Sequence, residues 1–512
     1  MVERAVVIGA GVGGLAAAMR LAHRGVDVTV LERHAAPGGK MRVVDSVAGP
    51  VDAGPTVLTM RAVFDDLFDA CGAALDDHVT LRPLEVLARH HWPDGSEMDL
   101  FSDYERSRDA IAELAGPRAA KQFARFHRDT ERLFAAFEGP MMQAAAPSVG
   151  GMAGVVARQP WLVPALAPGR TVAQDLRSRF TDPRLRQLFG RYSTYVGGYP
   201  NASPALLSLI WHAESRGVWS VEGGMHGLAR AMEAVARAAG ATFQYGLEAR
   251  RIVVEGGRVT GVQIGEAVLP ADAVVFNGDP RALVHGMLGE AARDVLPASA
   301  VDARSLSAFV WSFAAEAEGR VPEHHNVFFG RDPEAEFADI AEGRMPRDPT
   351  LYVCAQDAGG TATAGRYEII MNGPPRPGLD PDPEEMERCR ETTFDMLDRM
   401  GLRLERPPLE ALTTPEGFHR MFPGSDGSLY GLSPHGIMAA FRRPKARTDL
   451  PGLFLAGGGA HPGAGIPMAA TSGRLAVEAM IGDRASTSPS RPRATGGGTS
   501  TGSRRTVNAP SR

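Results

Sequence analysis

The sequence predicts an α/β fold in which segments far apart in the chain build one parallel sheet, with a mixed α+β domain inserted between them. A strand, a glycine loop, a helix and a second strand follow one another at residues 6–32. Strand patterns return at 248–279, and a strand, a glycine loop and a helix follow at 450–482. A chain of 512 residues has room for more than one core, so one interrupted α/β domain is the simplest account.

The opening unit has the periodicity of a β-α-β motif. Residues 6–8 are a β-branched run, which is typical of a buried parallel strand. Apolar residues then recur at helical spacing until Gly25, and the next strand, "VDVTVLE", ends at Glu32. The loop between the first strand and the helix carries a G-x-G-x-x-G pattern formed by Gly9, Gly11 and Gly14.

Each of the three glycines in this motif has a separate physical role. Gly9 makes the tight turn, Gly11 lets the backbone approach a pyrophosphate, and Gly14 lets helix and strand pack closely. The helix N-terminus offers free N–H groups to the phosphates, and Glu32 stands where an acid binds the adenosine ribose. The alternative is a glycine-rich turn without a nucleotide, but strand, helix and terminal acid in register favour the nucleotide. The loop alone does not separate FAD from NAD.

Composition excludes several other functions. The net charge is −5 and the pI about 6.3, so nucleic acid is not expected as a partner. Cys71, Cys354 and Cys389 lie far apart, which predicts neither disulfides nor a zinc site. The histidine pairs at 90–91 and 324–325 lack acidic or cysteine ligand spacing, so no metal is expected. The chain opens directly on the nucleotide-binding strand, from which we expect the cytoplasmic side, and the excess of arginine and alanine suggests a bacterial source.

Pattern changes along the chain predict the organisation. Residues 61–140 are charged and mostly helical in pattern, and the last residues lack the large apolar side chains that a core needs. The expected segments are cofactor-binding at 1–85, 220–285 and 418–483, substrate-binding at 286–417, substrate-binding and membrane-facing at 86–219, and a disordered tail at 484–512.

One uncharged stretch, "GPMMQAAAPSVGGMAGVVA" at 139–157, is followed by "QPWLVPALAPG" at 159–169. Glycine, proline and glutamine interrupt it, so it does not have the pattern of a transmembrane helix. It is either a buried or loosely helical lid, or a surface that enters a bilayer interface. In the second case the expected anchors are Trp161, Leu162, Val163 and Leu166.

Further motifs carry a family resemblance. "PGGKMR" at 37–42, "VDAGPTVLT" at 51–59 and "LFLAGGGAHPGAGIPMAATSGRLAVEAM" at 453–480, together with the opening loop, resemble the FAD-dependent amine oxidase and phytoene desaturase superfamily over positions 2–482. "AHPGAGIPMA", "FPGSDGSLYGLSPHG" and "YVGGYPNASPALLSLI" resemble its carotenoid desaturase branch. "GVWSVEGGMHGLARAM" and "HHNVFFG" are most similar to the C-3,4 desaturases of hydroxylated and methoxylated carotenoids, the hydroxyneurosporene and methoxyneurosporene type.

The resemblance implies FAD as cofactor and assigns site residues. Beyond the first glycine loop and Glu32, it places Gly39, Lys40 and Arg42 along the phosphates and ribityl chain. It places Gly457, Gly458 and Gly459 at a second phosphate-side loop, and Ile466, Pro467 and Met468 at the flavin ring. Independently of the family, a loop with almost no side chains admits a planar ligand, and Pro467 suits the first turn of a helix whose positive end stabilises charge on that ring.

The sequence does not identify a catalytic acid or base. His461 lies inside the second glycine motif, where it is either a base or, more in keeping with such loops, a structural group bonded to backbone. Removing hydride beside a polyene gives a delocalised cation, so the flavin performs the difficult step while the protein positions the chain and excludes water.

We therefore expect an FAD-dependent desaturase that acts at C-3,4 of an acyclic hydroxy- or methoxycarotenoid, peripheral to the cytoplasmic side of the inner membrane. The partners would be the apolar polyene, the membrane surface and an electron acceptor such as oxygen or a quinone. The alternatives are a phytoene desaturase, a carotenoid cis–trans isomerase that uses reduced FAD, and a non-enzymatic lipid carrier of the same fold.

Overall fold

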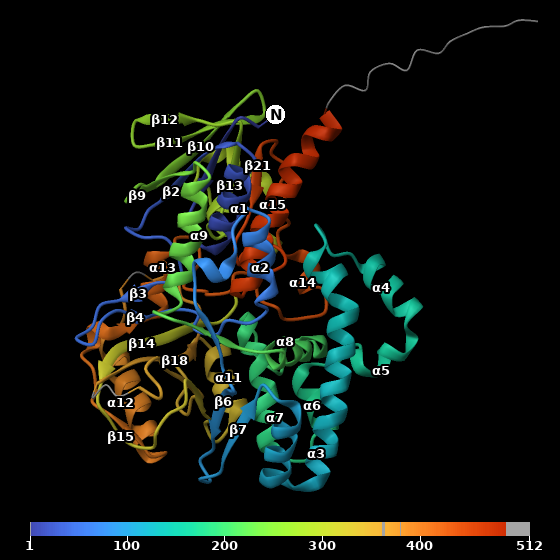
Figure 1. The fold of residues 1–512 in the computed structure, drawn as a ribbon, viewed down its shortest axis with the longest axis vertical. Helices are drawn as coiled ribbons and strands as arrows, with labels where there is room; N and C mark the ends of the chain where they lie inside the picture. Colours follow the sequence, from blue (N-terminus) through green and yellow to red (C-terminus); the bar gives the residue numbers. More distant parts are fainter. Residues whose placement is uncertain (1, 361–363, 379, 488–512) are drawn as a thin grey trace, which may run out of the picture.

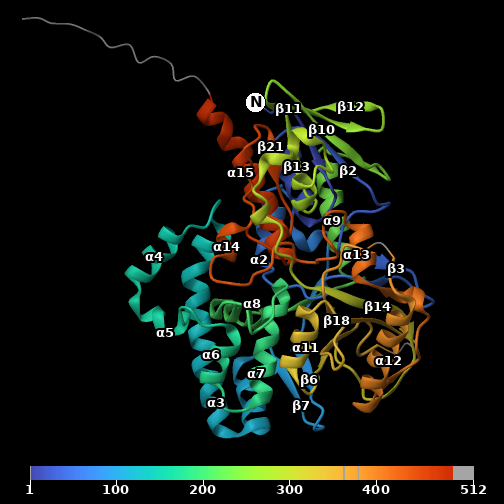
Figure 2. The ribbon, with the colours of Figure 1, turned by 180° about the vertical axis from the view of Figure 1, so that it is seen from behind.

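The computed structural model describes residues 2–360, 364–378 and 380–487. Figures 1 and 2 show three neighbouring parts. A nucleotide-binding part carries the N-terminus, a second part is built around a large sheet with α12 (Pro383–Arg399), and a third is helical and centred on α3 (Tyr104–Phe137). None of the helices within the described ranges combines the length and apolar character needed to cross a bilayer.

The nucleotide-binding part contains a five-stranded parallel sheet with the strand order β21-β13-β1-β2-β9. Its central strands are the β-branched runs expected from the sequence, and Val6 stands opposite Val274 in the register. Three separate segments of the chain supply the sheet, as expected. The strands are β1 (Arg4–Ile8), β2 (Asp27–Glu32), β9 (Thr242–Tyr245), β13 (Ala273–Phe276) and β21 (Leu453–Leu455).

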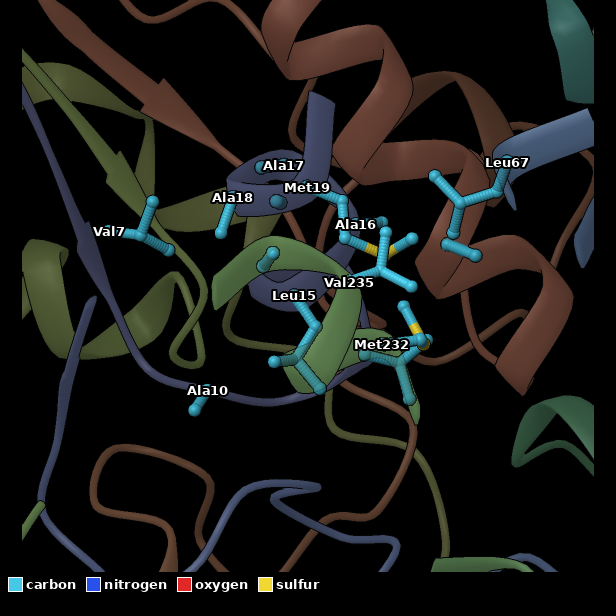
Figure 3. Packing of buried hydrophobic residues seen from close by; sticks show 14 of the residues in the cluster. Val7, Ala10, Leu15, Ala16, Ala17, Ala18, Met19, Leu67, Met232 and Val235 are labelled. Atoms are coloured by element: carbon cyan, nitrogen blue, oxygen red, sulfur yellow. The ribbon is translucent and has the colours of Figure 1, made fainter. Parts of the chain in front are cut away.

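Helices and a small sheet cover the two faces of this parallel sheet. Successive residues of a strand point to opposite faces, so Val7 packs in the helix-side core and Val6 in the other. On the helix side, Leu15 and Met19 of α1 (Val12–His23) meet Val235 of α9 (His226–Ala238) (Figure 3). α2 (Ala62–Asp69) and α15 (Ile466–Thr487) complete that layer. The other face carries β10 (Ala249–Glu255), β11 (Arg258–Ile264), β12 (Ala267–Pro270) and α10 (Arg281–Val284).

The second part is a seven-stranded sheet with the order β20-β14-β18-β17-β16-β6-β7. All neighbours are antiparallel except β16 and β6. α12 buries one face, and α11 (Pro333–Ala341) and α13 (Pro415–Met421) lie beside the other. The strands are β6 (Val86–His91), β7 (Glu97–Phe101), β14 (Ser307–Ala315), β16 (His325–Phe328), β17 (Leu351–Ala355), β18 (Gly365–Gly373) and β20 (Leu412–Thr413).

The third part is a cluster of helices around an aromatic core that includes Phe123, Phe189 and Trp211. α3 bends at Gly116, which has a positive φ of 84° and precedes Pro117, a residue without a backbone donor. The other helices are α4 (Val149–Arg158), α5 (Val163–Leu166), α6 (Val172–Arg179), α7 (Pro183–Gly190) and α8 (Ile210–Ser215).

Short strands and one short α-helix complete the strands and α-helices of the described residues. They are β3 (Val43–Val44), β4 (Val51–Asp52), β5 (Leu81–Pro83), β8 (Trp219–Val221), β15 (Ala317–Gly319), β19 (Leu402–Leu404) and α14 (Ala439–Arg442).

The structure corrects several expected boundaries. Residues 61–140 are mostly helical, as expected, but they also contain an unexpected hairpin, which β6 and β7 form around a Pro-Asp-Gly turn at 93–95. Leu288 and Val295, expected in the substrate segment, pack in the nucleotide-side core, whereas Phe418 packs on the seven-stranded sheet. α15 continues to Thr487, past the expected start of the tail at 484, and residues 488–512 of that tail lie outside the described residues.

Candidate active site

One cavity of about 1530 Å³ joins the three parts. It begins at the carboxyl ends of the parallel strands, where open α/β sheets bind their ligands, and continues beneath the seven-stranded sheet into the helical part. Its volume exceeds the roughly 300–1,000 Å³ of an ordinary small-molecule pocket, so it has room for a cofactor and a substrate together.

The first glycine loop is closely packed and forms part of the cofactor end of the cavity. Gly9 has a φ of 99°, and Gly14 packs so closely that a Cβ there would lie 2.1 Å from the carbonyl oxygen of Gly9. Gly11 is the residue before α1, whose N-terminus has no side-chain cap, and Gly9 and Gly11 line the cavity. Gly14 is not among the described cavity-lining residues, so its role is to pack the helix against the loop. Sequence reasoning missed Gly13, where a Cβ would lie 2.4 Å from the backbone nitrogen of Gly457.

Glu32 lies at the end of β2 and is 5% exposed. One carboxylate oxygen accepts a hydrogen bond from the N–H of Ala10, and the other from the N–H of His34, both at 2.8 Å. Each oxygen keeps a second lone pair, so the carboxylate can brace the loop and still accept from a ribose hydroxyl. Leu247, whose N–H donates to the Glu32 carbonyl, and Ala249, the first residue of β10, also line the cavity.

Asn277 follows β13 and connects the two glycine loops, a role that sequence reasoning missed. Its Nδ2 donates to the carbonyl of Gly9 at 3.2 Å, and its buried Oδ1 has no hydrogen-bond partner. A Cβ at Gly13 or Gly457 would lie 2.7 Å from that Oδ1. In the sequence, the only indication of this role is that a polar residue directly follows a buried strand. The pairing of β13 with β1 then places Asn277 beside the first glycine loop.

Arg443 holds the second glycine loop in place through hydrogen bonds to backbone carbonyls. Its guanidinium donates to the carbonyls of Gly458 at 2.6 Å, Leu432 at 2.8 Å and Tyr430 at 3.2 Å. Burial lowers the pKa of Arg443 to about 10, with Asp279 opposing that shift. The loop and the start of α15 line the cavity, and the lining includes the residues that the resemblance assigns to the cofactor, Gly457, Gly458, Gly459, Ile466, Pro467 and Met468.

Lys40 and Arg42 lie differently from each other. Gly39 and Lys40 line the cavity, and the Lys40 Nζ donates to the carbonyl of Leu429 at 2.6 Å. Burial lowers the pKa of Lys40 to about 8. Arg42 is not among the cavity-lining residues described, because its guanidinium turns away to donate to the Thr413 hydroxyl at 2.8 Å. The expected contact of Arg42 with the cofactor therefore has no geometric support.

His461 has a structural role. It is 2% exposed, its Nε2 lies 2.9 Å from the carbonyl of Ala144, and it is not among the residues that line the cavity.

A cluster of two histidines and a cysteine lies in the seven-stranded sheet, because the pairing of β16 with β17 places His325 opposite Cys354. Together with His324, these side chains bring three atoms of the kind that bind metals within 4.8 Å of one another. The spacing of these residues in the sequence did not predict this cluster. Burial raises the pKa of the Cys354 thiol, which disfavours the thiolate that metals bind.

The far end of the cavity is apolar. Side chains of α3 and of the segment after it, such as Phe137, Met141 and Met152, line it together with Leu166. In the segment 139–169 the side chains divide between two environments. Trp161 is 62% exposed and Val163 39%, whereas Leu162 is 1% exposed. Leu162 and Leu166 therefore do not belong among the expected membrane anchors, because they pack inward.

Comparison with known proteins identifies the family and similar relatives of this chain. Residues 12–308 match the family of flavin-containing amine oxidoreductases. The chain belongs to that family. Within it, the chain is 55% identical to the hydroxyneurosporene desaturase of Cereibacter sphaeroides, over 95% of this chain and 99% of that protein. It is 54% identical to the hydroxyneurosporene desaturase of Rhodobacter capsulatus, over 94% and 98%. This flavin-containing oxidoreductase therefore lies in the carotenoid desaturase branch of the family.

The fold is shared more widely. An oxidoreductase from Methanosarcina mazei superposes with a TM-score of 0.61 at 17% identity, over 94% of this chain and 100% of that structure. FAD is the cofactor of this flavin-containing oxidoreductase, and the residues present fit it. The glycine loops line the cavity with backbone that carries no side chains, α1 presents uncapped N–H groups, and Glu32 retains acceptor capacity.

Proposed function

We propose that this protein introduces a C=C bond at C-3,4 of an acyclic 1-hydroxy- or 1-methoxycarotenoid such as hydroxyneurosporene. The single observation that carries the proposal is the continuous cavity, which is glycine-lined at one end and apolar at the other. Such a cavity suits a dinucleotide followed by a long polyene. The names of the two relatives described above support a hydroxylated carotenoid as substrate and desaturation as the reaction.

When bound, FAD supplies the hydride acceptor. The protein contributes position and environment. The N-terminus of α15, which begins at Ile466, directs its positive end toward the cavity and favours negative charge that develops there. The apolar wall excludes water from the polyene. The neighbouring proton leaves a delocalised cation and needs only a weak acceptor, so we assign no catalytic acid or base.

Product analysis tests this function against its alternatives. The FAD-loaded enzyme is incubated in liposomes with a 1-hydroxylated acyclic carotenoid and a quinone, and separately with phytoene. We expect a product lighter by two hydrogens, absorbing at longer wavelength, from the hydroxylated substrate. A product of unchanged mass, formed only by reduced enzyme, would indicate an isomerase. Reaction with phytoene alone would refute the end group, and purification without flavin would favour the carrier.

We also propose that the enzyme works at the surface of the inner membrane, on its cytoplasmic side, and passes electrons to oxygen or a quinone. Its substrate dissolves in lipid, and the cavity wall includes Met152 and Leu166, close in sequence to the exposed Trp161 and Val163. Residues 139–174 carry arginines at 158 and 170 but no acidic residue, which suits anionic lipid headgroups.

A further inference from the structure

β18 presents one face to the cavity and the other to an apolar core. Glu368, Ile370 and Asn372 line the cavity, whereas the alternating residues Tyr367 and Ile369 pack in the core beneath α12. This alternation follows from the two-residue repeat of a strand. Glu368 is therefore the carboxyl group on a cavity wall to which the strands of this sheet also contribute Val310, Tyr352, Ile370 and Asn372.

Glu368 is fully buried, at 0% exposed, and no side chain among the described residues donates to its carboxyl oxygens, which only the backbone N–H of Gly54 approaches. Burial raises its pKa well above the ordinary value, while nearby Arg42 and the Gly54 backbone act in the opposite direction. Burial thus favours the protonated form of this carboxyl group, which has one O–H to donate and lone pairs to accept. A buried group with unused hydrogen-bonding capacity calls for a partner that the chain itself does not supply.

The surroundings of Glu368 place it where the cofactor end meets the substrate end. Its neighbour Gly54 belongs to the segment 54–56, which lines the cavity beside the cofactor loops. Thr56 in turn shares a hydrogen bond of 2.7 Å with the hydroxyl of Tyr352, which stands on the neighbouring strand β17. The other buried acid on the wall, Glu336, has a protein partner, the Thr350 hydroxyl at 2.8 Å. Glu368 has the greater unmet hydrogen-bonding capacity of the two.

The chemistry of the substrate requires an oxygen site at this junction. In a 1-oxygenated acyclic carotenoid, the oxygen on C-1 is only three bonds from C-3, where a hydrogen is removed. Any group that binds the oxygen must therefore lie beside the flavin ring rather than at the far end of the cavity. We propose, on the basis of the function proposed above, that Glu368 binds the C-1 oxygen and determines the preference for oxygenated carotenoids.

The proposal predicts discrimination against carotenoids without that oxygen. Such a substrate would leave Glu368 buried and unpaired in the complex, and sites built to pair with a hydroxyl reject analogues that lack it. We expect the wild-type enzyme to prefer the 1-hydroxylated carotenoid over its non-hydroxylated counterpart by about 10- to 100-fold in kcat/KM.

Substitutions at Glu368 test this directly in the FAD-loaded enzyme. Glu368→Leu and Glu368→Met remove the polar group at similar volume, and measuring both guards against one that misfolds. Glu368→Gln keeps a donor and an acceptor. We measure kcat/KM for the two carotenoids, their Kd from quenching of flavin fluorescence, and FAD content. The apolar variants should lose the preference through weaker binding of the hydroxylated substrate, while Glu368→Gln should keep most of it.

Glu336→Gln is the matched control, because it alters the other buried acid of the same cavity. It should leave the hydroxyl preference in place, and a loss of preference there would move the oxygen site and overturn the proposal. Retention of the preference in the apolar Glu368 variants would overturn it as well. So would loss of turnover with both substrates at unchanged Kd in all Glu368 variants. A wild-type enzyme that desaturates both carotenoids equally would refute this inference alone, whereas one that desaturates neither would refute the proposed function.

Discussion

At Gly11, an added Cβ would lie 2.8 Å from the side-chain nitrogen of Asn277, inside the loop that faces the cofactor. Gly11→Val should therefore push apart the two glycine loops and abolish FAD retention during purification. Gly150→Val is the matched control, since a Cβ at that helical glycine of α4 meets nothing within 4 Å. The flavin absorbance per protein measures the outcome, and full flavin content in Gly11→Val would show that the cofactor does not bind at this loop.

Glu336 gives a pH dependence with a defined sign. Burial raises its pKa to about 7, above the ordinary 4.5. Between those values the folded protein holds a proton that the unfolded chain releases, so this group's contribution to stability falls as pH rises from about 4.5 to 7. Glu336→Gln cannot ionise and should gain stability over wild type at pH 8 relative to pH 5, by up to about 3 kcal/mol.

Urea unfolding of the FAD-loaded wild type and variant at both pH values measures this effect. Glu405→Gln, at an exposed position, serves as the control and should show no such difference. An equal effect of Glu336→Gln at pH 5 and pH 8 would mean that Glu336 is not buried as a neutral acid.

Individual site residues were predictable where the signal is local. Gly9 and Glu32 belong to one β-α-β unit, whose spacing alone fixes their places. Asn277, Arg443 and Glu368 were not predictable in the same way. Asn277 and Glu368 act on partners far away in the chain, Gly9 and Gly54, and Arg443 holds carbonyl groups of irregular segments whose positions no local pattern predicts.

Among the elements, the segment from α4 to α5 carries the membrane proposal. Trp161 and Val163 are exposed, so replacing both with Asp removes an apolar surface and adds negative charge near Arg158. We expect reduced co-sedimentation with anionic liposomes and unchanged FAD content, since the flavin loops lie elsewhere.

The matched control for this test is Val268 and Val321, which are also exposed but belong to β12 and to a loop of the seven-stranded part. Replacing them with Asp should leave liposome binding intact. If the Trp161 and Val163 double variant still binds liposomes like the wild type, the segment is a lid over the cavity and not a membrane contact.

Some helices and strands could be predicted from sequence patterns alone, and others could not. In the nucleotide-binding part, β1, α1, β2, β13, β21 and α15 have strong patterns and were expected in their observed order, whereas the edge strand β9 was not expected. The hairpin of β6 and β7 was missed because its strand residues include His90, His91 and several charged side chains, so the region resembled its helical surroundings. Burial of those histidines depends on β16, which pairs with β6 from more than 200 residues away.

At the scale of the whole molecule, three parts with separate cores meet around one cavity. The parallel sheet supplies the cofactor loops, the seven-stranded sheet supplies the wall over the substrate, and the helical part extends the apolar end. The α/β class and the interruption by inserted segments followed from the sequence. The shared cavity did not, because it depends on how the three parts pack.

The most direct test of this account is a single turnover without oxygen. Oxidised, FAD-loaded enzyme is mixed anaerobically with a 1-hydroxylated acyclic carotenoid in liposomes, and both chromophores are followed. Desaturation should bleach the yellow flavin absorbance and move the carotenoid spectrum to longer wavelength, in equal amounts, and a quinone or oxygen should then restore the flavin. A carotenoid that changes while the flavin stays oxidised, or a flavin that no carotenoid bleaches, would contradict the central claim that this cavity transfers hydride from a polyene to FAD.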